Sequence, residues 1–217
     1  EPGLTPYITD FLLDAREAGF VVPAAALQKA MDRLSEDLLS GDPQFYGQDH
    51  REHLRFGYRA HAGYVLARVN RAPLGTLRAM YDQEKGRSLT GLPLVRLGLA
   101  LSMQGDARRG EAAVADGFAL DPSRRPAWSG DQGSVIRDDA LMLALLHERG
   151  RGKGGDDARA MQVARALQAR RASDGSGRLW LSTQEQMALV RLGRALQAGD
   201  GRQVAGQWRA GGRDAAA

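Results

Sequence analysis

Two histidines three residues apart, His50 and His53, come closest in this chain to a metal site or an acid–base pair. At this spacing two side chains lie on nearly one face of a helix, as in many zinc sites. A third ligand would have to come from Asp49, Glu52 or His61, and Glu52 is wrongly placed for the His-Glu-x-x-His pattern of metalloproteases. The pattern therefore favours surface or capping histidines, and we predict no metal ion and no cofactor.

Asp138 and Asp139, together with Glu185 or Asp131, are the acids that could form the paired carboxylates of a glycosidase. The separation of these side chains cannot be read from the sequence. Acids in the first turn of a helix favour the positive end of its dipole, and Arg137 stands beside them. A structural role is therefore the simpler interpretation.

No nucleophile is apparent. Ser102, Ser134 and Ser182 lack a Gly-x-Ser-x-Gly elbow, and the chain has no cysteine. The pairs Arg108-Arg109 and Arg170-Arg171 are interpreted as solvated helix ends near the negative pole of the dipole, or as contacts to another domain. We therefore predict no catalytic residue.

The composition indicates a globular domain. The chain has 217 residues, 43% of them hydrophobic, and no apolar run approaches the ~20 residues of a membrane span. The net charge is +4, but 30 basic and 26 acidic residues are spread along the whole length. Basic stretches interleaved with aromatic residues, which single-strand binding requires, are missing, so no nucleic-acid partner is expected.

Apolar residues recur with a helical period almost everywhere, and no stretch alternates as a strand would. The predicted fold class is therefore all-α. Helices are expected at about 5–18, 23–39, 49–70, 74–84, 92–104, 106–120, from 134 onward, at 156–172 and at 183–198.

The helix that begins near Ser134 carries apolar residues around much of its circumference, which predicts an inner helix covered on two sides. The last helix has the clearest start signal. Thr183 or Ser182 can cap it, Gln186 follows Thr183 by three residues as in a capping box, and Glu185 suits the positive end of the dipole.

Short connections between helices fit either a helical solenoid or a closed ring of helix hairpins. No repeat of fixed length is visible, which disfavours the solenoid. The glycine-rich stretches 150–155 and 173–177 lack the Gly-Lys-Ser/Thr ending of a phosphate loop and are expected to be surface loops.

Four segments resemble the thioester-type domain of bacterial alpha-2-macroglobulins. They are Leu4–Leu12 followed by Ala15–Glu17, then Tyr64–Gly75, Gly133–Leu141 and Trp180–Gln186. None is a chemical motif; their order and spacing carry the resemblance, which extends to about residue 197. It implies an α/α toroid of antiparallel helix hairpins over residues 1–198, with the first helices of the ring upstream of Glu1. Residues 199–217 are then a flexible tail or a linker to a following domain.

The resemblance also implies a function. In this family a Cys-x-x-Gln element, where present, forms an internal thioester that captures a protease or an amine covalently, and this cysteine-free chain cannot form that bond itself. The chain would be a non-catalytic domain of a broad-spectrum protease inhibitor that traps proteases after bait cleavage. In complement relatives of the toroid a histidine assists thioester transfer, and the chain order gives that place to His50 or His53.

Partners and location follow from the same resemblance. They would be target proteases and neighbouring domains of the same polypeptide, in a periplasmic lipoprotein whose lipid anchor to the inner membrane lies elsewhere. Two other classes are the alternatives: a toroid enzyme acting on glycans or prenyl groups, and a helical scaffold that binds a partner peptide in its groove. Aromatic residues make up only 6% of the chain, which argues against a sugar cleft.

Overall fold

The computed structural model describes residues 4–40, 49–122, 125, 131, 133–150, 156–173, 179–200, 209–210 and 213–214. Within these residues the chain is almost wholly helical, which confirms the all-α prediction. In chain order the helices are α1 (Leu4–Glu17), α2 (Ala24–Ser40), α3 (Arg51–Arg68), α4 (Leu74–Ala79), α5 (Gly91–Met103), α6 (Ala107–Ala119), α7 (Val135–Glu148), α8 (Asp156–Ser173) and α9 (Thr183–Asp200).

Two short strands are the exception among the described residues. Strand β1 (Arg209–Ala210) pairs antiparallel with β2 (Arg213–Asp214), inside the stretch 199–217 that was expected to be a tail. The other residues of that stretch beyond Asp200, including Trp208, lie outside the described residues, as do residues 151–155 and 174–177 of the two glycine-rich stretches 150–155 and 173–177. The domain boundary at residue 198 therefore stays a prediction.

One predicted helix is corrected. The stretch 74–84 is not a single α-helix: α4 ends at Ala79 and continues as a π-helical turn over Met80–Glu84 and a 3₁₀ turn over Lys85–Arg87. Glu84 receives two hydrogen bonds from Arg59 Nη1, at 2.8 and 2.9 Å. Such a change of helix type is a tertiary feature that periodicity does not reveal.

Helices α6 and α7 each begin directly after a residue whose side chain caps the helix. Asp106 accepts a hydrogen bond from Arg109 N at the start of α6, and Ser134 accepts one from Arg137 N at the start of α7. The capping box of α9 lies one residue earlier than Thr183 and Gln186. Ser182 Oγ accepts from Glu185 N while the Glu185 carboxylate accepts from Ser182 N, so each side chain satisfies the other's free backbone donor.

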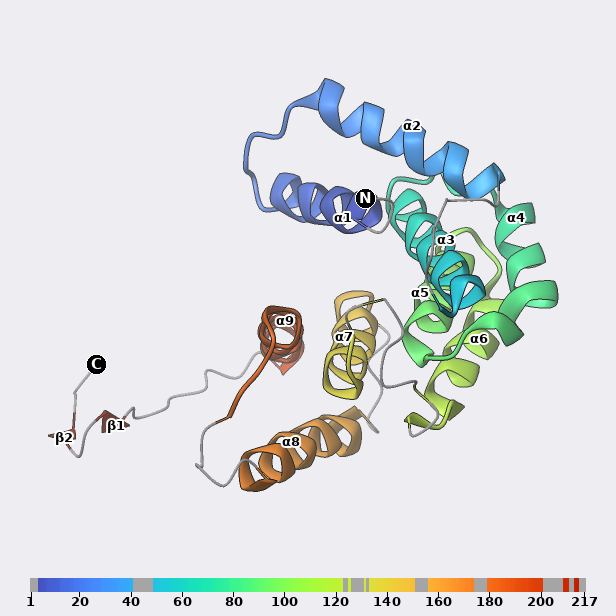
Figure 1. Ribbon diagram of the computed structural model, residues 1–217. Coiled ribbons are helices and arrows are strands. Elements are labelled where there is room, and N and C mark those ends of the chain that lie inside the picture. The colour runs from blue at the N-terminus through green and yellow to red at the C-terminus, as the bar shows by residue number, and fades with distance from the viewer. Residues whose placement is uncertain are drawn as a thin grey trace.

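The helices form two layers. The odd-numbered helices α1, α3, α5, α7 and α9 form an inner row, in which each packs against the next. On the outside, α2 covers α1 and α3, α6 covers α5, and α8 covers α7. Figure 1 shows the inner row as an arc from α1 (blue) to α9 (red-brown). This alternation of inner and outer helices agrees with the wall of the expected toroid.

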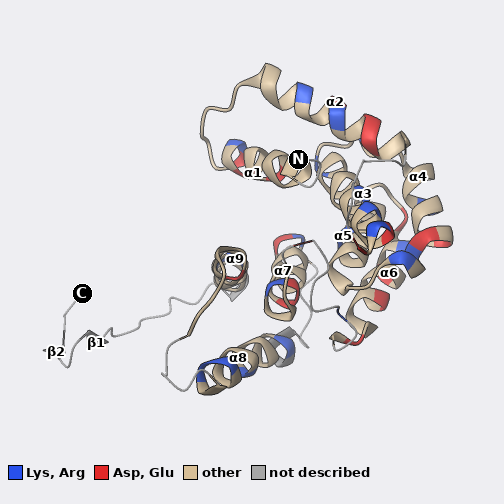
Figure 2. Ribbon diagram, in the orientation of Figure 1, with Lys and Arg blue, Asp and Glu red and all other residues tan. Residues whose placement is uncertain are grey.

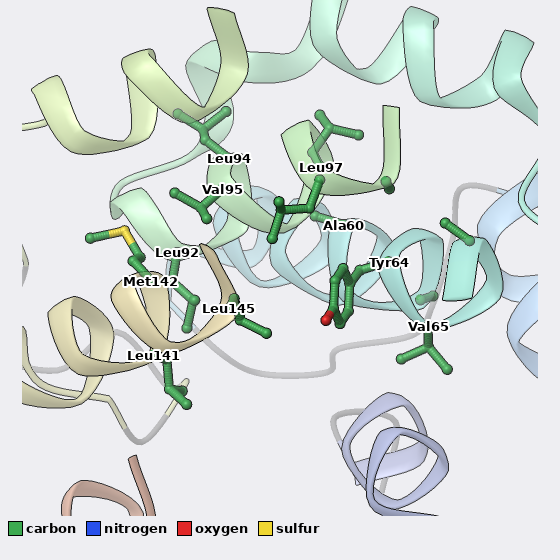
Figure 3. Close-up of a cluster of buried hydrophobic side chains, with 14 of the residues drawn as sticks. Ala60, Tyr64, Val65, Leu92, Leu94, Val95, Leu97, Leu141, Met142 and Leu145 are labelled. Atoms are coloured by element: carbon green, nitrogen blue, oxygen red, sulfur yellow. The ribbon is translucent and has the colours of Figure 1, made fainter. Parts of the chain in front are cut away.

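The hydrophobic core lies between the inner helices and their outer covers. Figure 3 shows its centre, where side chains of α3, α5 and α7 point toward one another. Tyr64 is fully buried there, and its hydroxyl accepts a hydrogen bond from Arg149 Nη2 at 3.2 Å. The prediction that α7 is an inner helix is confirmed, because it packs against α5, α8 and α9.

Four glycines bring α5 and α6 into close backbone contact. Gly91 and Gly98 of α5 face Gly117 and Gly110 of α6, and a Cβ atom built on Gly98 would lie 2.6 Å from Gly110 O. Only residues without a side chain allow two helices to approach so closely. This contact fixes where α5, and with it the centre of the inner row, lies against the outer layer.

None of the described helices is both long enough and apolar enough to cross a membrane.

Candidate functional site

The histidines at the start of α3 have different surroundings. His50 is exposed and precedes the helix with a positive φ of 58°, whereas His53 is buried. The Nδ1 atom of His53 accepts a hydrogen bond from Leu89 N at 3.2 Å, and its Nε2 lies 3.9 Å from Asp131 Oδ2. Among the described residues no three His, Cys, Asp or Glu side chains are grouped as metal ligands. The histidine pair is therefore divided between the surface and the interior.

The acids Asp131 and Asp138 belong to a cluster with two arginines. Arg125 contacts both carboxylates, bonding Asp138 Oδ2 at 2.5 Å, and Arg137 bonds Asp131 Oδ2 at 3.1 Å and Asp138 Oδ1. Burial works against the charge of Arg137, but the two carboxylates raise its pKa above the usual value. In this cluster both acids are paired with arginines.

Glu185 connects the ends of three helices. Its carboxylate accepts from Ser134 Oγ at 2.6 Å and from Arg170 Nη1 at 2.5 Å, in addition to its capping bond from Ser182 N. Burial would raise the pKa of Glu185, but these hydrogen bonds and the charge of Arg170 lower it on balance. The start of α7, the end of α8 and the start of α9 are thereby held together.

A second ionic cluster lies where α1, α3 and α9 meet. Asp10 is 6% exposed, and its carboxylate lies 2.5 Å from Arg68 Nη1, 3.4 Å from Arg191 Nη1 and 3.8 Å from His61 Nε2. Burial works against its charge, but the neighbouring His61 and the charges of Arg191 and Arg68 hold the pKa of Asp10 far below its usual range. Arg191 also bonds Glu148 of α7 at 2.7 and 2.8 Å, so four inner helices are joined here.

His61 is kept neutral in this cluster. Burial and the nearby Arg96 guanidinium lower the pKa of His61 to about 4, although Asp10 acts in the opposite direction. At neutral pH the imidazole therefore adds no charge to a site that already contains two guanidinium groups.

Most of the other residues singled out in the sequence have structural partners. Ser134 and Ser182 serve as helix caps, while Ser102 Oγ is enclosed without a hydrogen-bond partner. Arg170 stands in the last turn of α8, as expected, but Arg109 stands near the start of α6, which corrects its assignment to a negative helix end. It is held there by Asp82 and Asp106.

Sequence reasoning missed the residues around Asp10. Asp10, Arg68 and Arg191 lie far apart in the chain, and each is an ordinary charged residue on a helix. The sequence contained only one sign of this cluster. A charged residue on the apolar face of an amphipathic helix is expected to be buried, and a buried charge requires a partner.

Asp139 differs from all these acids, since it faces a pocket beside α7.

No protein-family model matches the chain. Among curated proteins, it is 60% identical over 205 residues to an alpha-2-macroglobulin of Xylella fastidiosa (strain Temecula1), a match that covers 94% of this chain. It is 38% identical over 213 residues, or 95% of the chain, to that of Escherichia coli K12. The chain belongs to the bacterial alpha-2-macroglobulin family.

Solved structures of the family share its fold. The crystal structure of Salmonella alpha-2-macroglobulin reacted with methylamine matches 94% of this chain with a TM-score of 0.79 at 36% sequence identity. The native Escherichia coli alpha-2-macroglobulin, spanning domain MG7 to the C-terminus, matches 91% with a TM-score of 0.78 at 37% identity and is covered to 30% of its length. The matching segment therefore lies between domain MG7 and the C-terminus of that relative.

The chain corresponds to a small part of these proteins. It spans 12% of the length of the Xylella and Escherichia coli relatives and 12% of the Salmonella chain. The ionic clusters described above are accordingly features of one segment, and the activity of a whole alpha-2-macroglobulin cannot be assigned to them.

Proposed function

We propose that the chain is the thioester-type toroid domain of a periplasmic, broad-spectrum protease inhibitor that traps proteases after they cut a bait segment. The observation that carries the proposal is the 60% identity to an alpha-2-macroglobulin along 94% of the chain. Identity at this level over 205 residues indicates that the domain keeps the fold of its relative.

Broad specificity is supported by two structures of the Escherichia coli relative. One is described as activated by trypsin and another as activated by porcine elastase. These proteases have different primary specificity pockets, one suited to basic and one to small side chains. A bait that both can cut is what a broad-spectrum trap requires, and we extend this property to the parent of the present chain.

The domain itself is proposed to be non-catalytic. Asp131, Asp138 and Glu185 are held by arginines, and Ser134 and Ser182 are occupied in capping. A thioester in the parent protein would have to be supplied by residues outside these 217, because the chain has no cysteine. The Salmonella relative was reacted with methylamine, an amine of the kind that attacks thioesters. Of the two candidate helper histidines, His50 is the exposed one.

Neighbouring domains are proposed to cover part of the surface. Leu4, Ile8 and Phe11 form an exposed apolar stripe along α1, at 49%, 49% and 64% exposure, with the i, i+4, i+7 spacing of one helix face. The upstream helices of the toroid, which the family resemblance implies, are proposed to pack on this stripe. We propose that these helices, and a lipid anchor elsewhere in the parent protein, complete a protein attached to the inner membrane.

Complex formation between the parent protein and a protease tests this function. An active protease should co-elute with the parent on size-exclusion chromatography, because bait cleavage triggers the trap. The same protease with its catalytic serine blocked should elute alone. Equal binding of both forms would indicate a simple docking partner, and turnover of peptide substrates by the parent alone would indicate an enzyme.

A further inference from the structure

A pocket of about 350 Å³ lies beside α7, between the two outer helices α6 and α8. Its lining comes from the start of α5, the end of α6, the first half of α7 and the first half of α8. This volume lies within the range of pockets that hold small ligands or single side chains. The trapping role proposed above does not depend on this pocket.

The walls of the pocket are apolar and polar in about equal parts. Phe118, Leu120, Met142 and Leu143 contribute to them, and Met142 also borders the core shown in Figure 3. Five charged residues line the pocket as well: Asp121, Arg125, Asp138, Asp139 and Arg159.

Four of these charges have partners. Arg125 and Asp138 bond each other at 2.5 Å within the cluster described above. The Arg159 guanidinium stacks on the ring of Phe118, 3.7 Å from its centroid, and Asp121 is exposed and has a partner of its own. Stacking of this kind holds the cation on the aromatic face.

Asp139 is the charge that is left. It is partly buried, and among the described residues its carboxylate makes no hydrogen bond and no ion pair. Burial and the neighbouring charge of Asp138 raise the pKa of Asp139 to about 6, with Arg159 acting weakly in the opposite direction. Above that pH the pocket contains an ionised carboxylate that makes no ion pair with any described residue and lies beside apolar side chains.

We propose that this pocket binds a primary alkylammonium group, with its nitrogen on the Asp139 carboxylate and its hydrocarbon chain along Phe118, Met142 and Leu143. A lysine side chain of a neighbouring protein segment and a small free amine share this chemistry. An ammonium ion would satisfy the unpaired carboxylate, and the methylene groups would cover the apolar walls. The inference goes beyond the proposed function and requires neither a thioester nor a trap.

Three ligands of the same length test the charge requirement. The full chain would be titrated at pH 7.5 with n-pentylamine, 1-pentanol and pentanoate, with binding followed by calorimetry and by NMR shifts of the pocket residues. We expect pentylamine to bind at least tenfold more tightly than the other two. Equal binding of pentanol would show that the pocket is only apolar, and a preference for pentanoate would assign it to Arg159; either result overturns the proposal.

Variants and pH identify the carboxylate. Asp139→Asn should weaken pentylamine binding at least tenfold, while Glu111→Gln, an equal change of charge on an exposed residue of α6, should leave it within twofold. Circular dichroism checks that both variants fold. With a pKa of about 6, the wild type should bind about tenfold more weakly at pH 5 than at pH 7.5, and the asparagine variant should lose this dependence. Unchanged binding by Asp139→Asn would refute the assignment.

The source of the ammonium is distinguished by a fourth ligand, Nα-acetyl-lysine amide. Affinity within a few-fold of that of pentylamine supports a lysine side chain on a protein segment as the occupant, while binding of pentylamine alone supports a small amine. Failure of every amine to bind would overturn this inference and leave the proposed inhibitor function untouched, because size-exclusion of the parent with a protease does not depend on the pocket.

Discussion

At the scale of single residues, buried charges join helices that are distant in the chain. Asp10, Arg68 and Arg191 come from three helices distant in the chain and meet where the two ends of the inner row approach each other. A buried pair stabilises little compared with an apolar pair, but removing one partner leaves an uncompensated charge in the interior. Asp10 therefore supplies the negative charge that the two arginines need when α1, α3 and α9 pack together.

The variant Asp10→Asn should lower the free energy of unfolding at pH 7 by about 3 kcal/mol, because it leaves Arg68 and Arg191 with less counter-charge. Since the pKa of Asp10 is lowered in the fold, its contribution is complete above the unfolded value of about 4 and is lost as pH falls below it. The difference between wild type and variant in urea denaturation should therefore shrink between pH 5 and pH 3.

Asp32→Asn provides the control, since Asp32 is exposed and pairs only with exposed partners. It should change stability by less than about 0.5 kcal/mol. An Asp10→Asn variant as stable as this control would show that the cluster does not hold the helices together.

At the scale of elements, local chemistry was predictable where a single residue ends or starts a helix. Asp106 and Ser134 cap their helices because their side chains satisfy free backbone donors. The capping box of α9 was placed one residue too late, since Ser182 and Thr183 are both good caps and only the contacts of Glu185 with α7 and α8 decide between them. The π-helical turn after α4 and the glycine contact of α5 with α6 depend on tertiary packing and give no periodic signal.

The glycine contact leads to a second prediction. Gly98→Ala should destabilise the chain by about 2 kcal/mol, because the new methyl group would lie 2.6 Å from Gly110 O and 2.9 Å from Val114 N, and backbone atoms cannot yield as a side chain can. Thermal unfolding followed by circular dichroism would measure the loss.

Gly193→Ala is the matched control. Gly193 lies in α9 with no atom within 4 Å of its added Cβ, so alanine should raise stability by up to ~1 kcal/mol through its better helix propensity. If both variants behave alike, helix propensity rather than close packing determines the role of Gly98.

At the scale of the whole molecule, the all-α class was predictable from periodicity, and the family from four short segments. The interior position of α7 followed from its broad apolar surface. The partners of the charged side chains were not predictable from the sequence. Asp138 and Asp139 are adjacent in the chain, yet Asp138 is paired with arginines and Asp139 faces a pocket. Figure 2 shows that most helices carry both basic and acidic residues. The composition of a helix therefore does not indicate which of its charged residues form ion pairs.

The identity to alpha-2-macroglobulins favours one of the classes that the sequence had suggested. A toroid enzyme and a peptide-binding scaffold rested on fold class alone, and fold class does not determine function. The relatives match nearly the whole chain and are alpha-2-macroglobulins, which supports a role as one part of a larger inhibitor.

The most direct test of that role is the residual activity of trypsin and of elastase after incubation with the parent protein, measured on casein and on a short chromogenic peptide. A trap encloses the protease without blocking its active site, so we predict that casein cleavage falls at least tenfold while peptide cleavage stays within twofold of the free protease. Equal loss of both activities would indicate active-site inhibition, and no loss of either would contradict the account.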